Sequence, residues 1–354
     1  MLILFLCCAF AAIYVSRLVY FRLWRKHLDA DITFSDPAVY AGDTLTLGEV
    51  ITNRKHLPLP RLEVSFRIPK GLEFIDAENT VVSDYVYKRD IFSLRSMEMI
   101  TRRYQVLCKQ RGRYEVSQLR LRTQSFFGKT GELAIEPPES QLLVYAGRTD
   151  VSGVDRLCDQ ILGEHESRRS LYEDPFLFNG IRSYQPADPI KYINWKAMAR
   201  TGEPMVNTFA SVQALSFMIY LDISDEKIIK EDELVEEGIR AAAVLIRRQI
   251  SLSQQTGLVI NTDPPVRFDP GRGQDLLSKI EYALTADFRS GDTVPFISLF
   301  AGEEDTSSVI RILISKEMQE RELEKLPFTA IFLIPVMKDG VPVTVCKLAG
   351  NGRR

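Results

Sequence analysis

Leu215-Ser216-Phe217-Met218-Ile219-Tyr220-Leu221 is a nearly uninterrupted apolar run in the C-terminal half of this 354-residue chain. A strand that is apolar at almost every position is typical of a parallel sheet covered on both faces. Similar apolar runs follow at residues 257–260, 309–314 and 330–334. These runs predict an α/β domain over residues 211–350.

Amphipathic patterns separate these runs. Between the first two, apolar residues from Leu234 to Ile250 fall on one helical stripe, with acidic residues at its start and arginines near its end. Two more helices are predicted at residues 275–285 and 316–326. The alternation predicts a doubly wound, mainly parallel sheet, whose ligand site would lie at the carboxyl ends of the strands.

A period of two dominates the preceding part of the chain. In residues 61–68, four apolar side chains alternate with four polar ones, which indicates a half-buried antiparallel strand. Shorter runs of the same kind occur at residues 44–50, 104–108, 119–123 and 142–145. Short strands separated by turn sequences such as Ala41-Gly42-Asp43 predict a β-sandwich over residues 27–146.

Residues 1–16 contain no charged side chain and would form a helix of roughly 24 Å. The helix would be long enough to cross a bilayer if Arg17 and Arg22 snorkel toward the headgroups and Tyr20 and Trp24 lie in the interfacial aromatic belt. We therefore expect a single-pass membrane anchor over residues 1–26. An apolar helix packed on a soluble body, or half of a helical hairpin, is the alternative.

The basic residues Arg17, Arg22, Arg25 and Lys26 all follow the apolar run. A cleaved signal peptide would have its positive charge before the run. By the positive-inside rule, this order predicts that the domains after the helix are cytoplasmic.

Charge and composition leave little material for catalysis. The chain has 45 basic and 47 acidic residues, a net charge of −2, so no overall field attracts nucleic acid. Three histidines lie far apart, and five cysteines lack metal-type spacing, so neither a zinc cluster nor a histidine triad is predicted. We expect a non-enzymatic protein without a cofactor; a hydrolase using Asp188 or Asp222 with metal-bound water remains an alternative.

Residues 178–200, FNGIRSYQPADPIKYINWKAMAR, are the most distinctive stretch of the chain and precede a helix predicted at residues 194–199. Two interpretations remain open. Arginine-to-aspartate hydrogen bonds would hold the loop while Trp195 buries the largest apolar area. Alternatively, the tryptophan, tyrosine and arginine side chains form a docking surface for a protein partner, because these residue types dominate interface hot spots.

This stretch resembles the signature G-x-R-x-Y-x-P-G-D-x-x-R-x-I-[DNH]-W-K-x-x-A-R of the domain-of-unknown-function-58 family, and residues 109–128 resemble a segment upstream of it. Ala187 and Lys191 depart from the pattern, and the lysine exchanges a bidentate fork for a point charge. The candidate partner-binding or structural residues on the signature are Arg182, Tyr184, Asp188, Lys191, Asn194, Trp195, Lys196 and Arg200.

The resemblance implies a von Willebrand factor A-like domain at residues 211–350 and a linker carrying the signature at residues 147–210. It also implies a bacterial protein that works with a MoxR-type AAA+ ATPase in the assembly or activation of an envelope complex. We therefore expect a membrane-anchored scaffold that binds protein partners. The alternative is an extracellular adhesion or sensing receptor with a metal-dependent site.

Such domains place D-x-S-x-S at the end of their first strand, where it binds Mg²⁺. Here Asp222, Ser224 and Glu226 occupy those positions, so the resemblance makes them candidate Mg²⁺ ligands. Glu226 replaces a serine, and its negative charge would weaken the capture of a partner's carboxylate. The alternative is a solvated loop that retains only the first aspartate of the fold.

Overall fold

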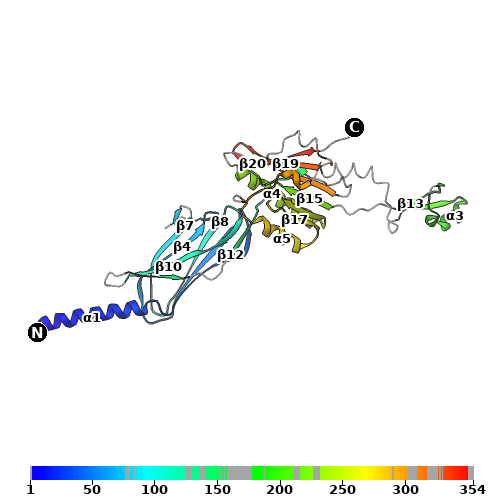
Figure 1. The fold of residues 1–354 in the computed structure, drawn as a ribbon. Helices are drawn as coiled ribbons and strands as arrows, with labels where there is room; N and C mark the ends of the chain where they lie inside the picture. The colour runs from blue at the N-terminus through cyan, green and yellow to red at the C-terminus, as the bar shows by residue number, and fades with distance from the viewer. Residues whose placement is uncertain are drawn as a thin grey trace. The chain divides into compact units, whose positions relative to one another are not determined.

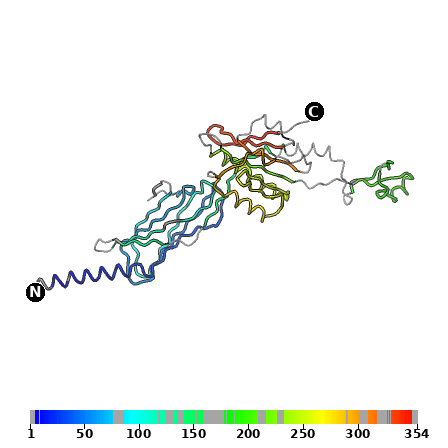
Figure 2. Tube along the Cα trace, in the orientation of Figure 1, coloured from blue at the N-terminus to red at the C-terminus, as the bar shows by residue number. Residues whose placement is uncertain are grey.

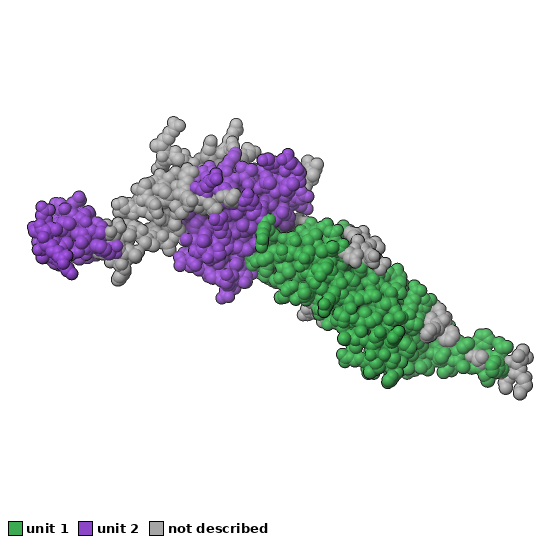
Figure 3. All heavy atoms as spheres, turned by 180° about the vertical axis from the view of Figure 1, so that it is seen from behind, with its two compact units in different colours: residues 1–148, 281–287 green, residues 149–280, 288–354 purple. Residues whose placement is uncertain are grey.

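A computed structural model of the protein describes residues 2–75, 80–82, 85–124, 130–135, 141–151, 153–154, 156–157, 178–186, 188–209, 216–225, 232–288, 291–300, 309–316, 326, 328 and 330–349. The chain divides into two compact units, coloured separately in Figure 3. One contains residues 1–148 with 281–287, and the other contains residues 149–280 with 288–354. The predicted finer boundaries at residues 26 and 210 stay predictions.

The first unit begins with α1 (Leu2–Leu23), which runs into the blue and cyan strands of a β-domain in Figure 2. Its stretch Phe5–Leu23 is long and apolar enough to cross a membrane. The end of the helix differs from our expectation of an interfacial aromatic belt. Tyr20 is only 7% exposed and Trp24 is fully buried, both within the core of the β-domain. These two rings therefore attach the helix to protein instead of lying among lipid headgroups.

The β-domain contains two larger sheets and a small one (Figure 1). The first sheet has the order β1 (Leu28–Phe34), β3 (Thr44–Asn53), β8 (Met99–Cys108) and β5 (Leu72–Phe74). The second has the order β11 (Thr130–Ile135), β10 (Ser117–Gln124), β4 (Leu59–Pro69), β7 (Tyr85–Leu94) and β6 (Thr80–Val82). The third comprises β2 (Ala38–Tyr40), β12 (Gln141–Tyr145) and β9 (Gly112–Glu115).

One hydrophobic core joins the inward faces of both larger sheets. In β3, Leu45, Leu47 and Ile51 are buried at alternate positions, and β4 buries Leu62 and Val64 in the same way. Alternation with a period of two places these side chains on one face of each strand. The predicted β-sandwich and its five sequence-predicted strands are therefore confirmed.

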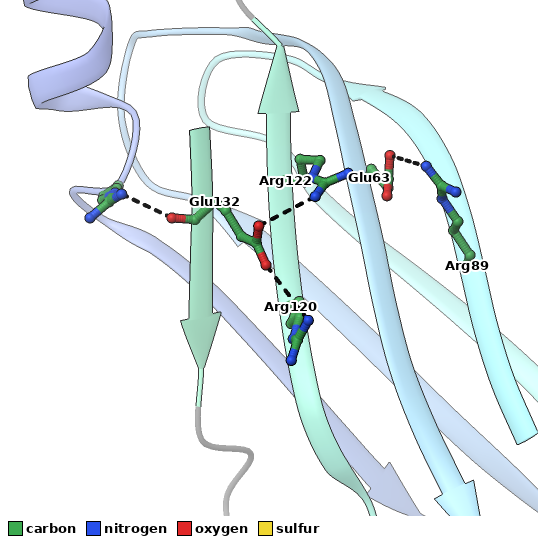
Figure 4. A network of polar contacts seen from close by, with 6 residues as sticks. Glu63, Arg89, Arg120, Arg122 and Glu132 are labelled. Atoms are coloured by element: carbon green, nitrogen blue, oxygen red, sulfur yellow. Dashed lines mark hydrogen bonds and ion pairs between the residues drawn. The ribbon is translucent and has the colours of Figure 1, made fainter. Parts of the chain in front are cut away.

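The outward face of the second sheet carries cross-strand ion pairs (Figure 4). Glu132 of β11 lies 3.4 Å from Arg122 and 3.9 Å from Arg120 of β10, and Glu63 of β4 lies 2.8 Å from Arg89 of β7. Exposed pairs of this kind add little stability. They keep this face of the sandwich polar.

The second unit is built on a six-stranded sheet. Its order is β17 (Val266–Gly271), β16 (Gln255–Ile260), β15 (Ser216–Leu221), β18 (Val309–Ile314), β19 (Ala330–Lys338) and β20 (Val341–Ala349). The four central strands are parallel, as their apolar sequences predict, but the two edge strands are antiparallel to their neighbours. The sheet is therefore mixed, and the von Willebrand factor A-like assignment stays a prediction.

Two helices in this part of the chain match their sequence predictions. α4 (Asp232–Ser251) buries its apolar stripe and contacts β15, β16, β19 and β20. α5 (Gln274–Leu284) follows β17, and a short 3₁₀ helix, η2 (Phe296–Phe300), precedes β18. The helix predicted at residues 316–326 falls almost entirely outside the described residues.

Candidate functional site

The signature stretch folds around a two-stranded antiparallel sheet. Its strands are β13 (Phe178–Ser183) and β14 (Met205–Phe209), and the chain between them forms a short 3₁₀ helix, η1 (Ile190–Tyr192), and α3 (Trp195–Thr201) (Figure 1). All eight sequence-predicted signature residues lie on this hairpin and its insert. The hairpin therefore brings them into one local structure.

Arg182 and Asp188 lock the loop that follows β13. Two guanidinium nitrogens of Arg182 donate to the two carboxylate oxygens of Asp188, both at 2.6 Å, and the backbone N–H of Gln185 donates to Oδ2 at 2.8 Å. The guanidinium holds the pKa of the Asp188 carboxyl below its ordinary value. A bidentate pair fixes geometry as well as charge. The predicted arginine-to-aspartate hydrogen bonds are confirmed.

Asn194 fixes the start of α3. Its Oδ1 accepts the N–H of Ala197 at 2.9 Å, which is an N-cap, and its Nδ2 donates to Oδ1 of Asn207 on β14 at 2.7 Å. Gly202 ends the helix with φ of 78°, a conformation that glycine adopts without strain. The sequence-predicted helix is confirmed, and Asn194 is also the residue that ties it to β14.

Trp195 is 65% exposed, so the interpretation in which it buries the largest apolar area is wrong. Neither η1 nor α3 contains a buried residue. The physical reason is that hydrogen bonds from Arg182 and Asn194 already hold the loop and the helix, which leaves the indole ring free of a packing role.

Basic side chains accompany the exposed tryptophan. Lys196 and Arg200 are exposed and four residues apart, so they share a face of α3 beside Trp195. Lys191 of η1 is also exposed, whereas Tyr184 is half-buried and donates its backbone N–H to Pro204 at 2.8 Å. We name Lys191, Trp195, Lys196 and Arg200 the motif surface.

A second group of polar residues lies at the carboxyl ends of the parallel strands. Asp222 follows β15, and its carboxylate accepts hydrogen bonds from Asn261 after β16 at 2.7 Å and from Ser315 after β18 at 2.6 Å. Ser224 donates its backbone N–H at 3.0 Å and its hydroxyl as well. Asp222 is 8% exposed and thus joins three strand ends inside the protein.

These residues fit a divalent cation poorly. Asp222 accepts four hydrogen bonds from neighbouring groups. One comes from the hydroxyl of Ser224, which donates to the carboxylate instead of joining it as a second ligand of a cation. In the same two loops, Lys316 pairs with Asp225 at 2.8 Å, so an ammonium group already supplies positive charge there. Glu226 lies outside the described residues. The geometry favours the loop interpretation, and the Mg²⁺ site stays a prediction.

A buried polar cluster lies between the two sheets of the sandwich and was not predicted from the sequence. The hydroxyl of Tyr104 lies 2.6 Å from Oε2 of Glu49 and 2.7 Å from Oδ2 of Asp90, and Arg102 pairs with Asp90 at 3.2 Å. Lys88 lies 5.0 Å from the centre of the Tyr104 ring. The signal was present in the sequence, because all five positions are in phase with the inward-facing apolar residues of their strands.

The single phenolic proton of Tyr104 cannot satisfy both carboxylates, and Oε1 of Glu49 is buried with no hydrogen-bond partner in the described part of the chain. Burial raises the pKa of Glu49 above its ordinary value of 4.5. Protonated, neutral Glu49 therefore stabilises the folded state fully below pH 4.5, and this contribution to the free energy of unfolding is lost as the pH rises through the raised pKa.

We therefore expect Glu49→Gln, which stays neutral, to gain stability relative to the unmodified protein as the pH rises from 4.5 to 8. Urea unfolding of the detergent-solubilised chain, followed through the fluorescence of buried Trp24, measures this difference. The surface variant Glu132→Gln should show no comparable change. A stability difference between Glu49→Gln and the unmodified protein that is constant with pH would contradict the expectation.

Comparisons with known proteins match part of this chain to a protein family. Residues 180–293 match the family described as Protein of unknown function DUF58. The match includes most of the signature stretch, β15 and the Asp222 loop, and it excludes the upstream resemblance at residues 109–128. The chain is also 23% identical over 192 residues to the Uncharacterized protein YeaD of Bacillus subtilis (strain 168); the alignment covers 52% of this chain and 45% of that protein.

Solved structures with a similar arrangement cover about a third of the chain. A non-cellulosomal cohesin from Archaeoglobus fulgidus is 9% identical, with a TM-score of 0.23 over 36% of this chain and 97% of its own. A type I cohesin–dockerin complex from Clostridium thermocellum contains a chain that is 10% identical, with a TM-score of 0.24 over 32% of this chain and 98% of its own.

Proposed function

Because residues 180–293 of this chain belong to the family Protein of unknown function DUF58, we propose that the protein is a membrane-anchored, non-enzymatic scaffold that docks a protein partner through the motif surface. The observation that carries the proposal is the exposed Trp195 on a rigidly braced hairpin. A tryptophan on a backbone that hydrogen bonds already hold requires no ordering of that backbone on binding, which favours its use as an interface anchor.

The two aspartates considered for hydrolysis support a non-enzymatic role. Both oxygens of Asp188 accept hydrogen bonds from Arg182, and both oxygens of Asp222 accept hydrogen bonds from neighbouring side chains. A general base needs a free acceptor within reach of the proton that it removes. Asp188 accepts three hydrogen bonds and Asp222 accepts four, so most acceptor positions of both carboxylates already serve to hold a loop.

The partner that we propose carries acidic side chains around an apolar pocket. Three of the four residues of the motif surface are basic, and the fourth is a large aromatic ring. The family resemblance suggests a MoxR-type AAA+ ATPase as this partner. We propose that the motif surface is cytoplasmic and that the complex acts in the assembly or activation of an envelope complex. The basic residues after α1 support this sidedness through the positive-inside rule.

Replacing Trp195 tests the docking surface. We expect Trp195→Ala to weaken binding of the purified ATPase to the full chain in nanodiscs by at least about 30-fold, because hot-spot truncation costs about 2 kcal/mol or more. Surface plasmon resonance measures the affinity, and Met337→Ala, which truncates another exposed apolar residue, is the matched control. Equal affinities for the two variants would exclude Trp195 as the anchor.

Sidedness separates this proposal from an extracellular receptor. A cysteine introduced at exposed Lys196 should react with a membrane-impermeant maleimide only after cells are lysed. The five native cysteines are first replaced by serine, because Cys7 and Cys8 are exposed and would react with the maleimide themselves. Labelling of intact cells would reverse the topology and favour the adhesion or sensing receptor.

A further inference from the structure

The end of α1 is built into the sandwich. The hydroxyl of Tyr20 lies 3.0 Å from that of Thr123 on β10, and the guanidinium of Arg25 donates to the backbone carbonyl of Glu132 on β11 at 2.9 Å. Only residues 2–19 of the helix precede these contacts, a length of about 27 Å. The hydrocarbon core of a bilayer is about 30 Å thick, so a helix that spans it leaves no spacer between the sandwich and the lipid headgroups.

Two loops far away in sequence lie beside the end of this helix. The backbone N–H of Arg54 donates to the carbonyl of His27 at 2.9 Å. The buried amide of Asn53 donates to the carbonyls of Leu57 at 3.1 Å and Arg95 at 2.7 Å. These bonds tie residues 22–29, 53–58 and 95–98 into one surface, which we name the helix-proximal end.

The helix-proximal end is strongly basic, although the whole chain is nearly neutral. Its three segments carry six basic side chains and two acidic ones, a net charge of +4 with the histidines neutral. Five of the basic residues, Arg22, Arg25, Lys26, Arg54 and Arg95, are exposed, whereas the ammonium of Lys55 is buried. One of the acidic residues, Asp29, pairs with Arg54 at 3.4 Å, and both side chains remain well exposed.

A large apolar side chain projects from the same surface. Met97 is 63% exposed at the β7–β8 turn, and its φ of 54° is a conformation that favours glycine or asparagine. An exposed apolar residue among basic side chains matches the layered chemistry of a membrane surface, where anionic headgroups lie above acyl chains.

We propose that the helix-proximal end binds anionic lipid headgroups, with Met97 inserted between them, so that the sandwich rests on the membrane surface. The proposal depends on the membrane anchoring proposed above. The charge of the helix-proximal end comes partly from two loops that are far from the helix in sequence. This surface would bind the headgroups of whichever leaflet faces the sandwich. Basic residues within a Debye length, about 8 Å at physiological ionic strength, are attracted by such a surface.

The test uses the full chain with its native cysteines replaced and a bimane fluorophore on Met97→Cys. The matched control carries the probe on Gln110→Cys, just beyond the opposite end of β8, because a ten-residue strand is about 30 Å long. Both proteins are reconstituted into phosphatidylcholine vesicles containing a headgroup spin label, with or without one phosphatidylglycerol in three lipids.

We expect phosphatidylglycerol to increase quenching of the Met97 probe about twofold and to leave the Gln110 probe unchanged. The double variant Arg54→Glu and Arg95→Glu should return the Met97 probe to its value in pure phosphatidylcholine. An anchored chain whose two probes are quenched equally, or whose Met97 quenching ignores phosphatidylglycerol, overturns this inference alone. Release of the chain by alkaline carbonate overturns the membrane anchor and this inference together.

Discussion

Asp222→Ala is expected to destabilise the second unit by about 2–5 kcal/mol, because it removes the acceptor of two buried hydrogen bonds. The amide of Asn261 and the hydroxyl of Ser315 both donate to Asp222, and both residues are buried. Each unsatisfied buried donor costs about 1–3 kcal/mol. The loss should concentrate at the carboxyl ends of β15, β16 and β18.

Hydrogen exchange measures this effect locally. Backbone amides of β15 and β16 should exchange faster in Asp222→Ala, while those of the sandwich serve as an internal reference. Asp222→Asn keeps one carbonyl acceptor and should cost clearly less. If Mg²⁺ slowed exchange in the unmodified protein and not in Asp222→Ala, Asp222 would instead be a metal ligand, and the loop interpretation would be wrong.

Periodicity predicted most of the fold because burial in this protein follows local sequence pattern. Alternation in residues 61–68 and the apolar run 215–221 matched β4 and β15 closely. The antiparallel edges β17 and β20 were not predicted, although each pairs with the strand just before it in sequence. β17 (VRFDPG) has few apolar residues, and β20 forms a hairpin with β19 across Asp339-Gly340 that was not recognised as a turn.

For the signature hairpin, the hydrogen bonds between Arg182 and Asp188 were predicted correctly, but the packing of Trp195 was not. Arg182 and Asp188 are six residues apart, so a turn brings them together without help from the rest of the fold. The exposure of Trp195 depends on what packs against the hairpin, and one sequence contains no such information. Similarly, Tyr20 and Trp24 have a composition suited equally to a lipid interface and to a protein core.

The buried cluster of Glu49, Lys88 and Asp90 shows the opposite case. Glu49 interrupts a strand that was predicted correctly, whereas Lys88 and Asp90 lie on β7, which was not predicted. In both strands, inward phase marks these charges as buried. Their partners Arg102 and Tyr104 come from another strand, so the network itself required the structure. The local sequence pattern therefore shows that a charged residue faces the core, but only the tertiary contacts show which residues pair with it.

Trp24→Ala should destabilise the sandwich by about 3–5 kcal/mol and detach it from α1. Trp24 is fully buried, and a side chain added at Gly131 would come within 3.0 Å of both its ring nitrogen and a ring carbon of Phe21. Glycine on β11 is what allows the two rings to approach the sheet. Large-to-small substitution at such a site leaves a cavity that the surrounding strands fill only in part.

Trp24→Phe is the informative control for this contact. The indole N–H of Trp24 is buried without a hydrogen-bond partner in the described part of the chain, so phenylalanine removes that cost while keeping most of the ring contacts. We expect a loss below about 1.5 kcal/mol for Trp24→Phe, measured by urea unfolding in detergent. Since Trp24 fixes how the sandwich meets the helix, Trp24→Ala should also abolish the phosphatidylglycerol-dependent quenching at Met97 while the chain remains membrane-bound. Quenching that survives in a Trp24→Ala protein would show that the loops reach the lipid without this joint.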